Sequence, residues 1–318
     1  MYDVAALGEL LIDFTCLSTD ADGYPTMAAH PGGAPANYLA ALTKFGAKTA
    51  MIGKVGNDAF GRLLIKTLKG TGIDTRGMLV SDDVFTTLAF VTLDDSGNRE
   101  FSFARKPGAD TQLRFDEIDL GVIDASKVLH FGTLSMTNEP ARDATYKAVE
   151  YAAGRGKLIS FDPNLRKPLW NDLDEAKRQM LWGLRHADVV KISDEETEFL
   201  FSLAPEESAK HIINSFGVRL VYVTCGAEGC FYRTKTASGF VKALSGIAVK
   251  DTTGAGDIFG GSAMYGLLRA GGVPEKLTAE ELENIVSFAC ASAGLSTTKA
   301  GGISSVPELG EVEAAMRS

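Results

Sequence analysis

Residues 250–262 read KDTTGAGDIFGGS, a glycine-rich turn that leads into an apolar helix. Gly254 and Gly256 remove side chains where a backbone must turn sharply or approach a ligand closely. The predicted helix presents unpaired N–H groups at its start, and its dipole favours an anion there. The stretch lacks the glycine-lysine-serine/threonine of a P-loop. It therefore predicts a phosphate cradle of another kind at the start of a helix.

Asp257 lies in the first turn of this predicted helix, beside any phosphate that the turn would hold. Its carboxylate has two interpretations. A carboxylate is a favourable residue in the first turn of a helix. It could instead take a proton from a hydroxyl group that attacks the phosphorus, since an anion placed beside an anion is costly without a chemical role.

Outward from this turn, most of the chain alternates apolar runs with helical patterns. Strands are predicted at 4–12, 48–55, 128–131, 157–162, 189–192 and 220–225, and helices at 36–45, 60–70, 142–155, 173–184, 194–201, 208–216, 258–270 and 279–295. Repeated strand–helix–strand units predict an α/β fold with a parallel central sheet and helices on both faces. The length of 318 residues suits a single domain over residues 1–318.

Two stretches interrupt the alternation. Residues 15–31 are polar and rich in turn residues, and residues 85–105 (FTTLAFVTLDDSGNREFSFAR) are β-branched and aromatic on both sides of DDSGN. The second stretch predicts a hairpin with its turn around 96–98. A hairpin inside an α/β pattern is either a lid or an extension of a sheet edge. We predict lid segments at approximately 15–31 and 85–106.

The composition excludes several classes of function. The net charge of −9 makes non-specific binding to nucleic acid unfavourable. No stretch approaches the ~20 apolar residues of a membrane span, and the N-terminus lacks the basic start of a signal peptide. The four cysteines and four histidines are scattered, which predicts no structural zinc, reduced thiols and a cytoplasmic location. Glycine is abundant, at 34 residues, which favours tight turns and close approaches to ligands.

Polar residues follow several predicted strands. Asp13 ends an apolar strand, and Gly32 and Gly33 precede a helix start that carries Asn37. Asn37 is either a polar surface residue or a hydrogen-bonding partner for a polyol. In open α/β sheets, ligands bind at the carboxyl ends of the strands. Asp13 is therefore a candidate ligand-binding residue.

Two further strand ends carry candidate residues. Residues 162–166 read DPNLR, and Arg166 could clamp phosphate oxygens or form a surface ion pair. Residues 224–229 read TCGAEG, which alone is weak evidence. One edge of the sheet is therefore expected to gather Asp13, Gly33, Asp162, Lys191, Gly226 and Asp257.

Two long stretches of the sequence resemble the signatures of a known family. GGAPANYLAALTKFGAKTAMIGKVGNDAFG (32–61) resembles the N-terminal signature of the ribokinase-like (PfkB) carbohydrate kinases, and DTTGAGDIFGGS (251–262) their C-terminal signature. Other stretches are similar to the fructokinase branch: GELLIDF (8–14), REFSFARKPGAD (99–110), DPNLRKPLW (162–170), KISDEETEFL (191–200) and TCGAEGC (224–230). The matches occur in family order and span nearly the whole chain.

The resemblance implies a Rossmann-like α/β/α sandwich with a small β-sheet lid, often used for dimerisation. It implies a cytoplasmic, ATP-dependent sugar kinase that takes Mg²⁺ with ATP and is activated by K⁺. The expected partners are ATP and a small sugar, with a homodimer through the lid.

The resemblance also implies roles for residues by their position in the motifs. Asp257 would be the catalytic base, and the anion hole would consist of Gly254, Ala255 and Gly256. The sugar would contact Asp13, Gly32, Gly33, Asn37, Arg105 and Asp257. Phosphate would contact Asn164 and Arg166. The nucleotide would contact Lys191, Thr224, Gly226, Gly229, Gly254 and Gly256. A monovalent cation would contact Asp251 and Thr253.

One motif departs from the family pattern. Many relatives carry an N-x-x-E motif that organises Mg²⁺ and phosphate, whereas residues 193–196 read SDEE. Fructokinase-like sequences share the serine form. The resemblance therefore implies Glu196 as a Mg²⁺ residue with less support than the rest of the site.

Three functions remain open at this point. The first is an ATP-dependent fructokinase that phosphorylates the 6-hydroxyl of D-fructose. The second is a kinase of the same family for 2-keto-3-deoxygluconate, a nucleoside or an aminoimidazole riboside. The third is a non-catalytic sugar-binding or partner-binding member, which the intact GAGD disfavours. A dehydrogenase is disfavoured because no G-x-G-x-x-G follows the first strand.

Overall fold

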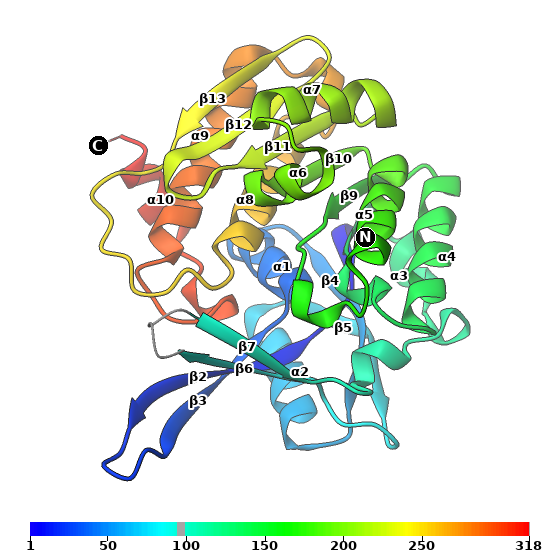
Figure 1. The fold of residues 1–318 in the computed structure, drawn as a ribbon. Helices are drawn as coiled ribbons and strands as arrows, with labels where there is room; N and C mark the ends of the chain where they lie inside the picture. Colours follow the sequence, from blue (N-terminus) through cyan, green and yellow to red (C-terminus); the bar gives the residue numbers. More distant parts are fainter. Residues whose placement is uncertain (94–98, 318) are drawn as a thin grey trace.

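The computed structural model describes residues 1–93 and 99–317, and its strands form two sheets (Figure 1). The strands of the large sheet are β1 (Tyr2–Leu7), β4 (Thr49–Gly56), β5 (Asp74–Ser81), β8 (Ser126–Gly132), β9 (Leu158–Asp162), β10 (Val189–Ser193), β11 (Leu220–Thr224), β12 (Gly229–Arg233) and β13 (Ser238–Lys242). The strands of the small sheet are β2 (Leu11–Thr19), β3 (Pro25–Gly32), β6 (Leu88–Leu93) and β7 (Arg99–Ala104).

Helices surround the large sheet. The α-helices are α1 (Ala34–Lys44), α2 (Ala59–Thr71), α3 (Leu120–Asp124), α4 (Ala141–Gly154), α5 (Leu173–His186), α6 (Asp194–Phe201), α7 (Pro205–Phe216), α8 (Ala255–Arg269), α9 (Ala279–Ser296) and α10 (Leu309–Ala315). Short 3₁₀ turns are η1 (Ala109–Gln112), η2 (Phe115–Glu117), η3 (Leu134–Met136), η4 (Lys167–Leu169), η5 (Gly226–Glu228), η6 (Pro274–Lys276) and η7 (Ile303–Ser305). Among the described residues no helix has both the length and the apolar character needed to cross a membrane.

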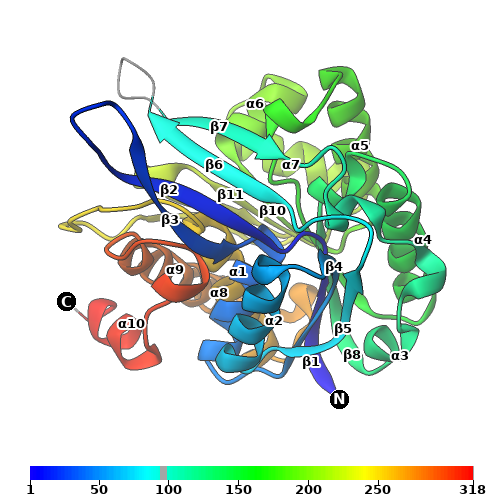
Figure 2. The same ribbon diagram turned by 90° about the horizontal axis from the view of Figure 1, so that it is seen from below.

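The predicted α/β/α sandwich is confirmed, and two hydrophobic clusters explain it. Alternate residues of β1 point to opposite faces, so Val4 and Ala6 join one cluster while Ala5 and Leu7 join the other. The first cluster includes residues of α1, α2, α8, α9 and α10, and the second includes residues of α3 to α7. The sheet therefore lies between two layers of helices (Figures 1 and 2).

The large sheet has the predicted parallel centre, and two antiparallel pairs at one edge make it a mixed sheet. In the described residues its order is β13-β12-β11-β10-β9-β8-β1-β4-β5. All pairs from β11 to β5 are parallel, whereas β12 pairs antiparallel with β11 and with β13. The sequence patterns also failed to predict β5, β12 and β13, which lie at or next to the two edges of the sheet.

The predicted strand at 4–12 is wrong, because the chain divides there into two strands of different sheets. Gly8 ends β1 with φ 155, and a Cβ at this position would lie 2.7 Å from Pro35 Cγ. β2 then begins at Leu11 and pairs with β3 and β6 in the small sheet. Asp13 therefore belongs to the small sheet and does not end a central strand.

The small sheet has the order β3-β2-β6-β7 in the described residues. Residues from both stretches that interrupted the alternation belong to it: β2 and β3 form one hairpin, and β6 pairs antiparallel with β7. The predicted turn at 96–98 lies outside the described residues. The β2–β3 hairpin extends away from the body of the molecule (Figures 1 and 2).

Candidate active site

The glycine-rich turn opens α8, as its sequence predicts. Gly254 caps the helix in the left-handed region at φ 76, and Asp257 lies in the first turn. A Cβ on Gly254 would lie 2.9 Å from Gly302 Cα and 3.1 Å from Asn37 Nδ2. Glycine is therefore required here both for the backbone conformation and for space.

Asp257 is a buried carboxyl group held by one amide. Asn37 Nδ2 donates to Asp257 Oδ2 at 2.9 Å, across 220 residues of sequence. Burial raises the pKa of Asp257, while the Lys191 ammonium, the Asn37 hydrogen bond and the Arg166 guanidinium oppose the rise. A carboxylate with a raised pKa is better suited to accept a proton than one with an ordinary pKa.

Asp13 lies near Asp257, where the small sheet meets α1. Burial raises the pKa of Asp13 to about 7, the charge of Arg166 lowers it, and the charges of Asp257 and Asp251 raise it. A Cβ on Gly32 would overlap Asp13 Oδ2, so Gly32 provides room for that carboxylate. Gly33 caps α1 at φ 115, with a Cβ position 2.5 Å from the Glu9 carbonyl oxygen.

Arg105 takes part in a different set of contacts. Its Nε donates to Asp110 Oδ2 at 2.8 Å, Nη1 donates to Thr137 Oγ1 at 2.7 Å, and Nη2 donates to the Leu134 carbonyl oxygen at 2.8 Å. The Asp110 carboxylate also accepts from Thr87 Oγ1. Among the described residues, no hydrogen bond joins Arg105 to Asp13, Asn37 or Asp257. Its predicted contact with sugar stays a prediction.

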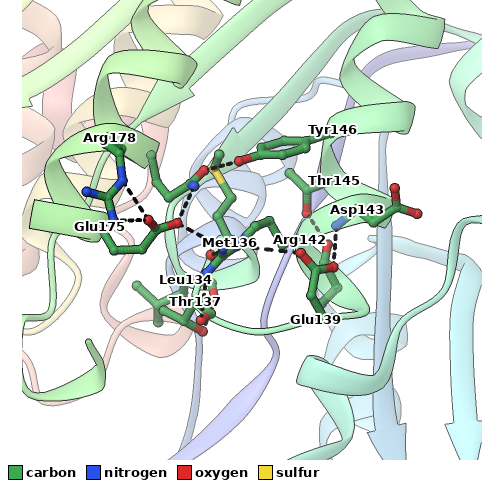
Figure 3. Close-up of polar contacts among 12 residues, drawn as sticks. Leu134, Met136, Thr137, Glu139, Arg142, Asp143, Thr145, Tyr146, Glu175 and Arg178 are labelled. Atoms are coloured by element: carbon green, nitrogen blue, oxygen red, sulfur yellow. Dashed lines mark hydrogen bonds and ion pairs between the residues drawn. The ribbon is translucent and has the colours of Figure 1, made fainter. Parts of the chain in front are cut away.

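Arg105 contacts the turn at 134–137, and residues of α4 and α5 in turn contact this segment (Figure 3). Arg142 donates to the carbonyl oxygens of Met136 and Thr137 at 2.8 and 3.1 Å. Arg142 also pairs with Glu175 at 2.8 Å. This network fixes the segment after β8 on which the Arg105 side chain rests.

The turn at 162–166 is fixed by Glu196. Glu196 Oε1 accepts from the Leu165 N–H at 2.7 Å, and Oε2 accepts from the Ser193 N–H at 2.8 Å. Asn164 adopts a positive φ of 45 in this turn. Arg166 is exposed, and its charge lowers the pKa of both Asp13 and Asp257. The turn therefore brings a cation to the two carboxyl groups.

Lys191 lies within β10 and not at its end, beneath the glycine-rich turn. Its Nζ is 3.1 Å from Asp162 Oδ2, and a Cβ on Gly256 would lie 3.0 Å from Nζ. Burial lowers the pKa of Lys191, but the charges of Asp162, Glu196 and Asp257 outweigh burial and raise it overall. The side chain is therefore a partly buried cation next to the predicted anion hole.

A cavity of about 380 Å³ adjoins this turn. Its lining includes the predicted nucleotide residues Thr224, Gly226, Gly229 and Gly256. It also contains residues that the sequence did not indicate: Ala243, Leu244, Gly246, Ile247, Val249, Cys290, Gly294 and Thr297. These come from α9 and from the segment after β13, which has apolar and glycine residues but no recognisable motif. The cavity is mainly apolar and of a size that suits a nucleotide base.

Asp251 joins two loops beside the anion hole. Its Oδ1 accepts from the Thr253 N–H at 2.9 Å, and its Oδ2 accepts from the Gly301 N–H at 2.9 Å. Thr253 Oγ1 also donates to Asp251 Oδ1. Across the described residues, no group of three or more His, Cys, Asp or Glu side chains is arranged to hold a metal ion.

Two residues of the site were missed from the sequence. Glu9 is buried between β1 and β2, accepts from the Ala34 N–H at 2.8 Å, and has its pKa raised by burial to about 7. Gly302 lies against Asn37. Glu9 belongs to the GELLIDF stretch, whose similarity to the fructokinase branch could have indicated it. No sequence motif indicated Gly302, because its importance depends on packing against Asn37, which is distant in sequence.

Comparison with known proteins identifies the family. The model of the pfkB family carbohydrate kinases matches residues 1–309, so the chain belongs to this family. The probable fructokinase-4 of Arabidopsis thaliana is 40% identical over 318 residues, covering 99% of this chain and 96% of the relative.

Solved structures agree with that assignment. A fructokinase from Xylella fastidiosa with bound ATP superposes with a TM-score of 0.91 at 29% identity, covering 100% of this chain and 99% of the other. A double mutant of a fructokinase from Vibrio cholerae O395, with fructose, ADP and a potassium ion bound, gives a TM-score of 0.87 at 30% identity. That superposition covers 99% of this chain and 98% of the other.

Proposed function

We propose that the chain is an ATP-dependent fructokinase that transfers the γ-phosphoryl group to the 6-hydroxyl of D-fructose. The observation that carries the proposal is the buried Asp257 carboxyl, held by Asn37 at the start of α8 and close to Asp13. The relatives and the solved structures named fructokinase support the choice of sugar.

Asp257 acts as the base of the reaction. Its carboxylate accepts the proton of the 6-hydroxyl while the hydroxyl oxygen attacks the γ-phosphorus in line, and ADP leaves with the electron pair of the broken P–O bond. The N–H groups of Gly254, Ala255 and Gly256, together with the dipole of α8, stabilise the charge on the transferred group. Lys191 adds a partly buried positive charge beneath them.

The substrates occupy the two sides of this turn. Sugar hydroxyls bind Asp13, Asn37 and the backbone at Gly32 and Gly33, with Arg105 contributing from the small sheet. The phosphates lie near Asn164 and Arg166. The nucleotide base enters the cavity that Thr224, Gly226 and Gly229 line.

Mg²⁺ bound with ATP would neutralise phosphate charge. It usually keeps several waters and few protein ligands when it binds with a nucleotide. Each oxygen of Glu196 accepts one N–H and retains a second lone pair. Glu196 can therefore orient a metal-bound water while it holds the 162–166 turn.

K⁺ is the proposed activating ion, at the loops that Asp251 joins. A cation at Asp251 and Thr253 would order the glycine-rich turn before ATP binds. Rates at equal ionic strength should be higher in K⁺ than in tetramethylammonium. K⁺ should also raise the melting temperature of the nucleotide-free protein more than tetramethylammonium does. Identical rates and melting temperatures would remove the ion from the proposal.

A second candidate substrate is 2-keto-3-deoxygluconate. The exposed Arg166 guanidinium acts on both Asp13 and Asp257, and a guanidinium suits the carboxylate of an acid sugar. Fructose is preferred because Asp13 would repel a nearby substrate carboxylate but accepts hydrogen bonds from hydroxyl groups.

The deciding experiment is a coupled ADP-release assay across fructose, glucose, 2-keto-3-deoxygluconate and nucleosides. We expect the highest kcat/KM with fructose, because a site built for particular hydroxyls rejects analogues by up to ~10⁴-fold. A better keto-acid substrate would retain the kinase and replace the sugar. No turnover with any substrate would favour a binding protein.

We also propose a homodimer that forms through the small sheet. Its support is the exposed apolar side chains at or near this sheet, Leu17, Tyr24 and Phe85.

A further inference from the structure

The Asn37 side chain packs closely against Gly302. It is only 3% exposed. A Cβ on Gly302 would lie 2.5 Å from Asn37 Nδ2 and closer still to Cγ and Oδ1. Gly302 therefore forms the wall against which the Asn37 amide packs.

The backbone of Gly302 does not require glycine. It caps η7 with φ −86 and ψ −74, outside the left-handed region that favours glycine. The absence of a side chain at this position is therefore explained by space alone. The space is occupied by the Asn37 amide.

The amide has one orientation in this enclosure. An ionised Asp257 carboxylate can only accept hydrogen bonds, so the Asn37 nitrogen must face it. Asn37 Oδ1 then lies in the interior without a hydrogen-bond partner. No bond to Oδ1 fixes the amide, so its position depends on the Asp257 hydrogen bond and on the packing of Gly302 and Gly254 around it.

We infer that Gly302 is a positioning residue for the proposed phosphoryl transfer, acting through Asn37 on Asp257. The inference rests on the proposed role of Asp257 as the base. The bare Cα of Gly302 lets Asn37 Nδ2 bind Asp257 Oδ2, which turns Oδ1 of Asp257 toward the substrate hydroxyl. Among the described residues, Asn37 is the only hydrogen-bond donor to this carboxylate, so no second contact would replace it.

A competing explanation places the effect of Gly302 on the phosphate side. Gly302 Cα lies 2.9 Å from the position of a Cβ on Gly254, so the two glycines are close neighbours. A side chain on Gly302 could then displace the anion hole directly. In that case its effect would not depend on Asn37.

A double-mutant cycle separates the two explanations. Gly302→Ala should lower kcat by about 10²-fold, the scale of a misplaced reacting group, with the KM for ATP little changed. Asn37→Ser shortens the side chain and so leaves room for the added methyl group. The double variant should be no slower than the slower single variant, because both changes break one contact. Additive losses would overturn the inference.

Two further variants provide an independent test and a control for the double-mutant cycle. Asn37→Asp keeps the shape and removes the donor, so it should lower kcat more than it raises the KM for fructose, even if Gly302→Ala fails to fold. An unchanged kcat in Asn37→Asp would overturn the inference. Gly310→Ala, on the exposed surface of α10 with no atom within 4 Å of the new Cβ, is the control that should keep normal kcat.

A crystal structure of the Gly302→Ala variant tests the geometry without turnover. The Asn37 Nδ2 to Asp257 Oδ2 distance should exceed hydrogen-bonding range, and a distance still near 2.9 Å would overturn the inference. Failure of the unmodified chain to phosphorylate any sugar would instead count against the proposed function. The two failures are therefore distinguishable.

Discussion

Burial raises the pKa values of several carboxyl groups around the site. Burial raises the pKa values of Glu9 and Asp13 to about 7, and it also raises the pKa values of Asp162 and Asp257. Lys191 and Arg166 oppose this at Asp257. The ionisation of Asp13 and Asp257 therefore depends on nearby cations, which suits proton transfer near neutral pH.

Replacing Asp257 tests the base directly. Asp257→Asn keeps the shape of the side chain and removes its basicity, so kcat should fall by ~10² to 10⁴-fold. ATP and fructose dissociation constants, measured by calorimetry, should change little. Asp174→Asn, in the exposed first turn of α5, is a matched control for the loss of a helix-start carboxylate. Near-normal kcat in Asp257→Asn would show that another group takes the proton.

Glu9 gives a prediction for stability against pH. Its pKa is about 7 in the folded chain and 4.5 as its ordinary value. Between these values the folded state keeps a proton that the unfolded state has lost, so Glu9 makes the protein less stable as pH rises through this window. The slope approaches about 1.4 kcal/mol per pH unit.

The test is Glu9→Gln, which keeps an oxygen to accept from the Ala34 N–H. The free energy of unfolding of this variant, relative to the unmodified chain, should increase from pH 5 to pH 7 and then level off. Glu313→Gln, on the exposed surface of α10, should show no such trend. A difference that is the same at every pH would contradict the assigned pKa.

At the scale of elements, the start of α8 combines three requirements in four residues. Gly254 supplies a left-handed cap, Gly256 leaves space above Lys191, and Asp257 supplies the carboxylate. This arrangement leaves the N–H groups at the helix start open to a phosphate, with a carboxylate beside them.

Gly256→Val tests this element. A Cβ at this position would lie 3.0 Å from Lys191 Nζ, and the branched side chain would fill the entrance where phosphoryl oxygens meet the N–H groups. We expect kcat to fall more than the affinity for fructose. Gly70→Val, at the end of α2 with no atom within 4 Å of the new Cβ, controls for valine in a helix. Normal kcat with only a raised fructose KM would argue against an anion hole here.

The elements that the sequence predicts well are those with their own local signal. The glycine-rich turn, the helix start at Asn37 and the apolar parallel strands are of this kind. The break at Gly8 was missed because GELLIDF continues the apolar run, and the positive φ of Gly8 and its packing against Pro35 appear only in the folded chain. The edge strands β5 and β13 were missed because their residues are mixed in polarity, as edge strands exposed to solvent often are.

The same reasoning applies to the site. Residue types indicated Asp257, Asp13 and Asn37, but the hydrogen bond between Asn37 and Asp257 joins residues 220 apart. The partners of Arg105 in the structure, Asp110, Thr137 and Leu134, depend on how the small sheet meets the large one. These hydrogen bonds join elements that come together only in the folded chain, so no local sequence pattern could predict them.

At the scale of the whole molecule, the small sheet carries apolar surface that the chain itself does not cover. On the β2–β3 hairpin, Leu17 is 66% exposed and Tyr24 is 70% exposed. The hairpin extends away from the body (Figures 1 and 2). The proposed homodimer would cover these apolar side chains, because each hairpin would pack against a second copy of the chain.

Light scattering after size-exclusion chromatography tests this association. The unmodified chain should have twice its mass of 33.8 kDa, and the variant with Leu17→Lys and Tyr24→Lys should have the mass of one chain. Val80→Lys, on the exposed edge strand β5, should remain a dimer. Because Asp13 lies on the same strand as Leu17, loss of the dimer should raise the KM for fructose and leave the KM for ATP nearly unchanged. A monomeric unmodified chain, or a double variant that stays dimeric, would show that this hairpin is not the interface.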